Sequence, residues 1–165
     1  MSTVGDSRAV ELTWRSRPVG SGALVGVGAA AFLDETLFHQ ILHWHHFWDG
    51  GSQSAGLVSD GLFHLAGTLC LVSGLFLFAD LRRRGTFNRP LWWAGFCFGN
   101  GGFELYDGIV QHKILHLHQI RYHVTLWPYD VTWNVIAAII LIVGFVLYRR
   151  AVRAPSGRQA GDLHR

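Results

Sequence analysis

Asp34-Glu-Thr-Leu-Phe-His39-Gln-Ile-Leu-His43-Trp-His45-His46 closes an otherwise apolar run that begins after Arg17. Ionisable side chains are costly inside a segment of membrane length, so a cluster of them points to function. A second stretch has the same pattern: Asp107-Gly-Ile-Val-Gln-His112-Lys-Ile-Leu-His116-Leu-His118-Gln119. The two stretches align without a gap, and the matched pairs are Asp34 with Asp107, His39 with His112, His43 with His116, and His45 with His118. We interpret this match as an internal repeat.

The composition around these stretches is typical of a membrane protein. Half of the 165 residues are hydrophobic and only 15% are charged, which is too little polar surface for a soluble globule of this size. Four apolar segments are long enough to span a bilayer, at residues 19–38, 57–81, 91–110 and 131–148. We therefore expect an all-α fold, an integral membrane four-helix bundle built from two helix-pair repeats of parallel topology.

The distribution of arginine predicts the orientation of the chain. Basic residues precede the first span, join the second to the third, and follow the fourth, whereas the opposite connections hold only Lys113 and Arg121. By the positive-inside rule, both termini are cytoplasmic, the protein is multi-pass in the plasma membrane, and the His-rich ends face outward. This topology accounts for the net charge of +3 without a nucleic-acid partner.

These boundaries define the expected domain organisation. Residues 1–17 form a cytoplasmic tail, residues 18–150 the four-span domain, and residues 151–165 a second cytoplasmic tail. The first repeat covers about residues 18–81 and the second about residues 90–150. The first and third spans are rich in glycine, which allows close helix contact, so we expect these helices to touch across a pseudo-twofold axis. The same faces would also suit a homodimer.

Polar groups from all four spans are expected at one level near the outer boundary of the bilayer. At a rise of 1.5 Å per residue, Asp34, His64 and Asp107 each stand roughly 26–27 Å above the cytoplasmic arginines. Glu104 and Asn134 stand roughly 22 Å above them. The sequence therefore predicts a polar layer contributed by every helix.

Histidines four residues apart stack on one face of a helix, the arrangement by which one helix chelates a metal through two imidazoles. The candidate metal ligands are His39, His43, His64, His112 and His116, with Asp34, Asp60 and Asp107 either binding the metal or accepting an imidazole N–H. Residues expected to support them are Glu35, His45, His46, Glu104, His118 and Asn134. Imidazole and carboxylate without thiolate suit iron, copper(II) or zinc, and a bundle of this kind can hold one or two ions.

The motifs resemble a known family. Asp34-Glu-x-x-Phe-His39-Gln-Ile-Leu-x-Trp-His-His, Asp60-Gly-Leu-Phe-His64 and Phe103-x-x-x-Asp107-Gly-x-x-x-His112-Lys-x-Leu-x-x-His-Gln are similar to those of the small four-span bacterial membrane proteins grouped as domain-of-unknown-function family twenty-two forty-three. The resemblance covers about residues 20–148 and implies a four-span protein of bacterial plasma membranes. It implies no particular activity.

Three functions remain open at this point. The first is a metal-dependent enzyme, oxidative in type, acting on a lipid-soluble or periplasmic substrate; its His-x-x-x-His spacing resembles one box of the membrane di-iron desaturases and hydroxylases. The second is handling of copper or zinc, with delivery to a periplasmic metal or redox partner. The third is a structural or assembly protein in the lipid bilayer, because single histidines and tryptophans are also common at membrane interfaces. Catalysis is favoured slightly over handling.

Overall fold

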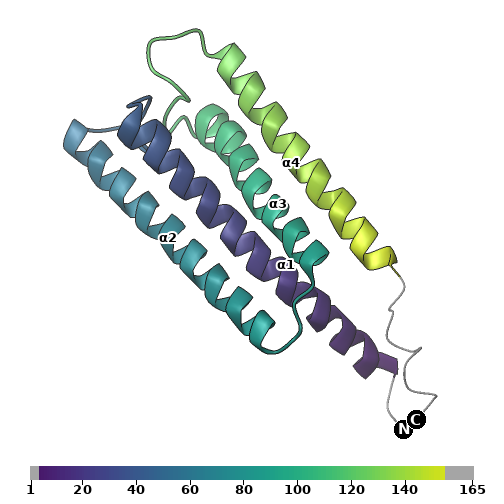
Figure 1. The fold of residues 1–165 in the computed structure, drawn as a ribbon. Coiled ribbons are helices and arrows are strands. Elements are labelled where there is room, and N and C mark those ends of the chain that lie inside the picture. The colour runs from purple at the N-terminus through teal and green to yellow at the C-terminus, as the bar shows by residue number, and fades with distance from the viewer. Residues whose placement is uncertain (1–3, 155–165) are drawn as a thin grey trace, which may run out of the picture.

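The computed structural model describes residues 4–154, with side chains from Arg15 onward, and this part of the chain is helical with no strand. Four α-helices, α1 (Val4–Asp34), α2 (Gln53–Arg83), α3 (Arg89–Tyr106) and α4 (Trp127–Arg153), form the body (Figure 1). Two π-helical segments, η1 (Glu35–Ile41) and η2 (Asp107–Ile114), continue α1 and α3. The all-α prediction is confirmed.

The four helices lie in the order α2, α1, α3, α4 (Figure 1). The closely packed pairs in the described residues are α1 with α2, α1 with α3, and α3 with α4. Aromatic side chains add contacts between α2 and α3, where the rings of Phe63 and Phe103 lie 5.8 Å apart. The expected contact between the first and third helices is therefore present, and α1 and α3 form the centre of the molecule.

Glycine makes the contact between α1 and α3 possible. A Cβ added at Gly22 would lie 2.1 Å from the carbonyl oxygen of Trp92, and one added at Gly99 would lie 2.0 Å from that of Ala23. Gly26 and Gly95 are equally close to the facing backbone. Only residues without a side chain allow two helix backbones to approach this closely, as in many membrane helix pairs.

Local sequence signals explain where the helices begin. The hydroxyl of Ser52 accepts a hydrogen bond from the N–H of Ala55 at the start of α2. The side chain of Asn88 does the same for the N–H of Leu91 at the start of α3. Such caps satisfy N–H groups that have no partner inside the helix. Pro128 stands in the first turn of α4, where its missing N–H costs nothing.

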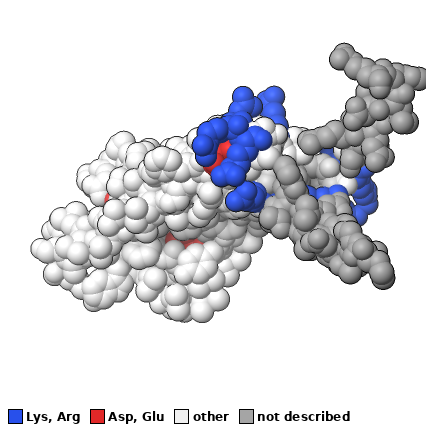
Figure 2. Space-filling model, turned by 90° about the horizontal axis from the view of Figure 1, so that it is seen from below, with Lys and Arg blue, Asp and Glu red and all other residues white. Residues whose placement is uncertain are grey.

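In the part of the chain that the structure describes, three helical segments are long and apolar enough to cross a membrane: Arg15–Ile41, Gln53–Arg83 and Trp127–Arg153. The remaining helix, α3, has 18 residues and includes Asn100 and Glu104. Large apolar side chains on α2 and α4 are exposed, as expected of surfaces that face lipid. Lysine and arginine side chains gather toward one end of the molecule (Figure 2). These features support a membrane protein.

The first and last helices extend beyond residues 18–150, the predicted four-span domain. The helix α1 begins at Val4, so most of the segment 1–17 that was expected to be a tail continues the first helix. The helix α4 ends at Arg153, three residues into the predicted tail 151–165. Residues 1–3 and 155–165 lie outside the described part of the chain.

Candidate metal centre

The two motifs both lie where an α-helix changes to a π-helix. A π-helix has hydrogen bonds from residue i+5 to residue i, as in Leu42 N–H to Leu37 O (2.9 Å) and Leu115 N–H to Val110 O (2.8 Å). This geometry brings side chains five residues apart onto the same face. Nε2 of His39 consequently lies 3.4 Å from Oδ2 of Asp34. In an α-helix, side chains five residues apart point in different directions, and the π-helix is the reason that those of Asp34 and His39 do not.

His43 and His116 each lie two residues after the end of a π-helix. Both have left-handed backbone conformation, with φ of 51° and 50°, which turns the chain away from the helix axis. Their side chains are exposed. The pairs His39–His43 and His112–His116, which four-residue spacing places on one helix face, therefore do not form.

After this turn, the loop between η1 and α2 pairs with the loop between η2 and α4. The N–H of Asp49 donates to the carbonyl of Leu117 (2.9 Å), and that of Tyr122 donates to the carbonyl of Trp44 (3.0 Å). Asp49 and Tyr122 are 73 positions apart, as are Trp44 and Leu117. The two bonds thus exchange equivalent positions, as two elements related by a twofold axis would.

This pairing brings the next histidine of each motif back into the interior. Nδ1 of His45 lies 3.0 Å from the carbonyl of Ile120, and Nδ1 of His118 lies 2.8 Å from the carbonyl of Phe47. A carbonyl oxygen can only accept, so each Nδ1 carries the proton and each Nε2 holds a lone pair. The two imidazoles stack at 4.7 Å with their planes 3° apart.

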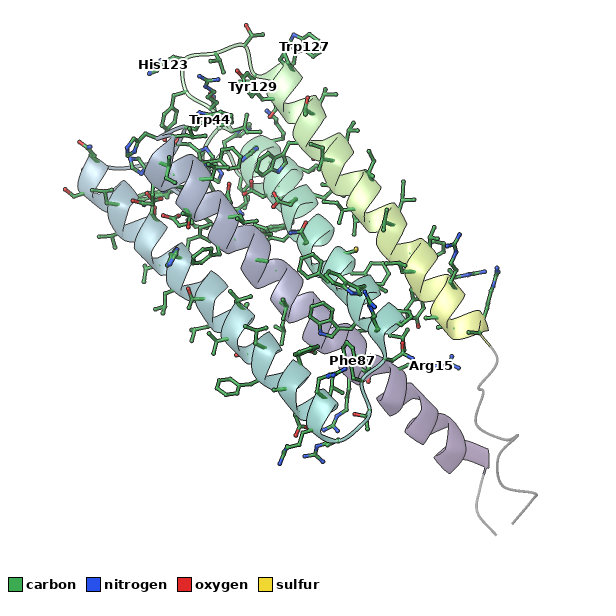
Figure 3. All side chains as sticks on the ribbon, in the orientation of Figure 1. Arg15, Trp44, Phe87, His123, Trp127 and Tyr129 are labelled. Carbon is green, nitrogen blue, oxygen red and sulfur yellow. The ribbon has the colours of Figure 1, made fainter. Side chains whose placement is uncertain are left out.

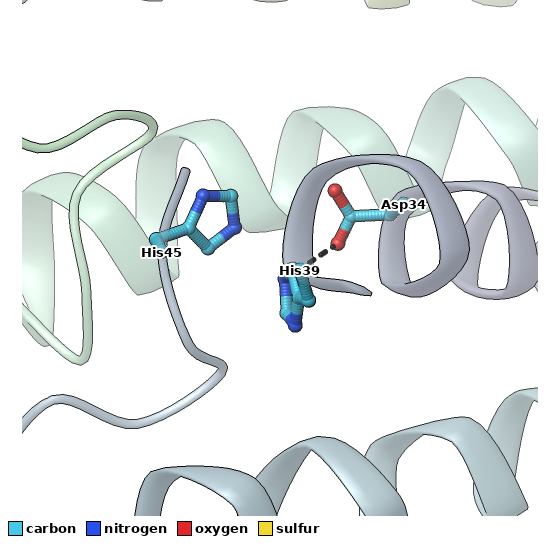
Figure 4. A group of neighbouring side chains, drawn as sticks. All are labelled: Asp34, His39 and His45. Carbon is cyan, nitrogen blue, oxygen red and sulfur yellow. Dashed lines mark ion pairs between the residues drawn. The ribbon is translucent and has the colours of Figure 1, made fainter. Parts of the chain in front are cut away.

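The first triad consists of Asp34, His39 and His45, drawn in Figure 4. One nitrogen or oxygen of each residue lies within 4.8 Å of those of the other two. The residues are 4%, 2% and 3% exposed, respectively. Asp34 ends α1, His39 lies in η1 and His45 comes from the loop, so three different backbone conformations converge on one point (Figure 4).

The second triad consists of the equivalent residues Asp107, His112 and His118, all buried. Nε2 of His112 lies 3.0 Å from Oδ2 of Asp107 and 3.0 Å from Nε2 of His118. Nε2 of His118 lies 3.6 Å from Oδ1 of Asp107. Two donor atoms that bind one zinc ion in tetrahedral geometry, each at about 2.0–2.1 Å, lie about 3.3 Å apart. The second triad therefore has the spacing of a metal site.

Carboxylates surround the outer nitrogen of His39. Its Nδ1 lies 2.8 Å from Oε2 of Glu35 and 3.1 Å from Oδ1 of Asp60, and these three residues form another buried group with ligand atoms close together. Asp60 also binds Nδ1 of His46 at 2.6 Å and the N–H of Phe47 at 2.7 Å. A carboxylate on the outer nitrogen fixes the ring of a metal-binding histidine and raises its basicity.

The equivalent nitrogen of the second triad has a different environment. Gly108 occupies the position equivalent to Glu35, and Nδ1 of His112 has no hydrogen-bond partner in the described residues. The side chain of Asn134 lies against Gly108, because a Cβ added there would be 2.8 Å from the Asn134 Oδ1. Its amide nitrogen donates to the carbonyl of Asp130 at 2.8 Å. Backbone geometry is thus shared between the two triads, whereas the supporting side chains are not.

The two loop histidines are held neutral. Burial, together with the nearby His39, His118 and His112, lowers the pKa of His45 to about 2. Burial also lowers the pKa of His118, against the opposing effect of Asp107. A neutral imidazole with a buried lone pair is the form that binds a metal.

Two other predicted site residues lie apart from the triads. His64 is half-buried on α2 with its ring 5.1 Å from that of Phe32, and among the described residues it belongs to none of the groups that could hold an ion. Glu104 is half-buried on α3, where its backbone carbonyl accepts a hydrogen bond from Nε1 of Trp133 at 3.2 Å. We had expected only a supporting role for His45 and His118; the one signal for their place in the triads was that they belong to the aligned motifs.

Comparison with known proteins identifies a family. No match was found among the curated proteins or among the solved structures. The model of the family described as predicted membrane protein (DUF2243) matches residues 21–151, which run from the middle of α1 to within two residues of the end of α4 and include both triads. The match covers most of the chain and agrees with the resemblance of the motifs. The chain therefore belongs to this family of predicted membrane proteins.

Proposed function

We propose that this membrane protein binds two transition-metal ions, one in each triad, and uses them as a metal-dependent enzyme. The observation that carries the proposal is the pair of buried imidazole lone pairs of His45 and His118. Each faces an aspartate and a second histidine, and Nε2 of His45 has no hydrogen-bond partner in the described residues. A buried polar atom without a partner is costly in an apolar surrounding, and a metal ion would remove that cost.

The charges of the layer support two ions. Four carboxylates, those of Asp34, Glu35, Asp60 and Asp107, are buried beside the histidines. With neutral imidazoles, four ionised carboxylates would leave four uncompensated negative charges at membrane depth, where unpaired charge is strongly unfavourable. Two divalent cations would balance this charge.

The donor set also bears on the kind of metal and the kind of activity. Nitrogen and oxygen ligands without thiolate suit zinc, iron or copper(II). Each triad supplies three protein ligands, as catalytic sites commonly do, and so leaves a coordination position for water or substrate. Bound ions of this type activate water or oxygen. The residues of the triads would hold the ions, and the loop carbonyls and Asp60 would fix the orientation of the imidazoles.

Metal handling is a second candidate function. The exposed imidazoles of His43 and His116 each lie in the chain between the two histidines of a triad and could receive copper or zinc from a periplasmic partner. Rapid exchange of bound metal with a soluble chelator would favour handling, whereas slow exchange would favour a resident catalytic ion.

We further propose the membrane arrangement that the arginine distribution favours. All four helices span the plasma membrane as two related helix pairs, both termini are cytoplasmic, and the triads lie near the outer face. The exchange of equivalent hydrogen bonds between the two loops, at a constant offset of 73 positions, supports the relation between the pairs.

Metal analysis tests the central proposal. The protein is purified in detergent without a histidine tag, and its metal content is measured by inductively coupled plasma mass spectrometry. We expect about two equivalents of one transition metal. The double variant H45A/H118A should lose them, and the matched double variant H43A/H116A should keep them. Protein that stays empty after incubation with iron, copper and zinc would refute the proposal.

A further inference from the structure

An apolar pocket of about 410 Å³ lies between η1 and α4, beside the first triad. Four aromatic side chains, Phe38, Trp44, Tyr129 and Trp133, form its walls together with isoleucines. The ring of Phe38 contacts those of Trp44 at 4.9 Å and Trp133 at 5.3 Å, so the walls are held in place before any ligand enters. The volume falls toward the lower end of the range for small-molecule sites, about 300–1,000 Å³.

The positively charged side chain of Arg121 lies over two of these aromatic rings. The guanidinium of Arg121 is 4.7 Å from the ring centre of Trp44 and 5.4 Å from that of Tyr129, and it donates to the Tyr129 hydroxyl at 2.7 Å. Figure 3 shows Trp44 and Tyr129 near each other at the end of the molecule that holds the loops. Arg121 has no carboxylate within ion-pair distance among residues 15–154, whereas Lys113 is paired with Asp130 at 2.5 Å.

A second pocket offers an internal comparison. It has about 260 Å³ and is lined by Phe47 and Phe63 among others, at positions equivalent to residues of the first pocket. The residue equivalent to Arg121 is Trp48, which is uncharged. Of these two pockets, only the first therefore has an arginine over two of its aromatic rings.

We propose that the pocket between η1 and α4 binds a long-chain fatty acid, with its hydrocarbon chain among the aromatic rings and its carboxylate on Arg121. Arginine presents a planar fork of N–H donors that matches a carboxylate, and it stays charged at any physiological pH. The pocket has room for one chain rather than the two chains of a phospholipid. Binding does not depend on the metal ions, although Phe38 and Trp44 directly precede two residues of the first triad.

Quenching of tryptophan fluorescence tests the proposal in phosphatidylcholine nanodiscs. The probes are palmitic acid and hexadecanol, both brominated on the chain, which differ in head-group charge. We expect the acid to bind about tenfold more tightly than the alcohol, in line with a hydrogen bond to a charged group. In R121Q this preference should disappear. It should persist in K113Q, which removes the other outward-facing cation. Equal affinities for acid and alcohol in the native protein, or a preference that survives in R121Q, would overturn the proposal.

Two further measurements test where the fatty acid binds and whether a membrane lipid binds there instead. T132F, which adds a ring to the pocket, should weaken binding of both probes, and unchanged binding would overturn the assignment of the site. Displacement of the acid by an equal concentration of diacyl phosphatidylglycerol would identify a membrane lipid as the occupant and overturn the single-chain assignment. Metal content measured on the same samples keeps the result separate from that of the metal proposal.

Discussion

The first and second triads have the same backbone geometry and differ in the side chains that surround their π-helical histidines. In both, a π-helix aligns an aspartate with a histidine, and the opposite loop fixes a second histidine through its Nδ1. Behind His39 stand two buried carboxylates, whereas Nδ1 of His112 has no partner in the described residues. The comparison teaches that backbone geometry places the nitrogen and oxygen atoms of the triads, and that the surrounding side chains can then give the two proposed sites different metal affinities.

Removing the π-helical histidines should produce the largest effect and break the symmetry between the triads. Each of H39A and H112A should lose about one of two metal equivalents, because each triad loses a ligand. H39A should in addition destabilise the protein by about 3–5 kcal/mol, since it removes the imidazole that lies between the buried carboxylates of Glu35 and Asp60. H112A should cost less. Metal content and thermal unfolding in detergent measure both effects, and equal destabilisation by the two variants would contradict the described asymmetry.

Neutralising Asp60, a carboxylate beside Nδ1 of His39, should sharpen the comparison between the two triads. D60N removes a charge that orients His39 and His46, so we expect the first site to bind metal about 10–100-fold more weakly while the second is unchanged. Competition with a chelator of known affinity would resolve the two sites. D130N serves as a control, because Asp130 is bound to Lys113 outside the triads. A loss of affinity at both sites would indicate one shared centre.

Replacing the turn histidines should affect both halves alike and only slightly. H43G and H116G should keep both ions and leave stability unchanged or raised by about 1–2 kcal/mol, because glycine adopts the left-handed conformation without the steric cost of a side chain. Metal analysis and unfolding curves measure this. Loss of metal in either variant would restore the His-x-x-x-His pair as the ligand set.

The contact between the loops should give the smallest effect. The hydroxyl of Tyr122 donates to Asp49 and accepts from the N–H of His46. Y122F should cost about 0.5–1.5 kcal/mol. Burial and the neighbouring Asp49 raise the pKa of Tyr122, so the hydroxyl keeps its proton and its contribution is lost only as pH rises through that raised value. Unfolding of the native protein and Y122F across neutral pH should therefore differ by a constant amount; a difference that changes between pH 6 and 8 would contradict this.

The helical architecture could be predicted from apolar length and glycine spacing. The close contact of α1 and α3 followed from residues such as Gly22 and Gly99, because only small side chains allow two membrane helices to approach. The aligned motifs also pointed to His39, His112 and their aspartates, which the structure gathers into buried groups.

Which residues come together in each triad could not be predicted from local sequence. A period of 3.6 residues pairs His39 with His43, whereas the π-helix pairs His39 with Asp34. The inward position of His45 depends on the carbonyl of Ile120, which is 75 positions away. Neither a π-helix nor a contact between distant loops has a signature in residue spacing, and the left-handed turn at His43 lacks the glycine that usually marks one.

The glycine contact between α1 and α3 has a mechanical consequence for the distant triads. Gly26 lies about 20 Å along the helix from His39, yet the two helices that meet there carry both π-helical segments. The contact sets the angle between α1 and α3, and each helix continues beyond it to a π-helical segment that carries residues of a triad. A single methyl group at Gly26 would change the angle between the helices and move the two π-helical segments apart, so a mutation that touches no triad residue would widen the spacing of the proposed metal ligands.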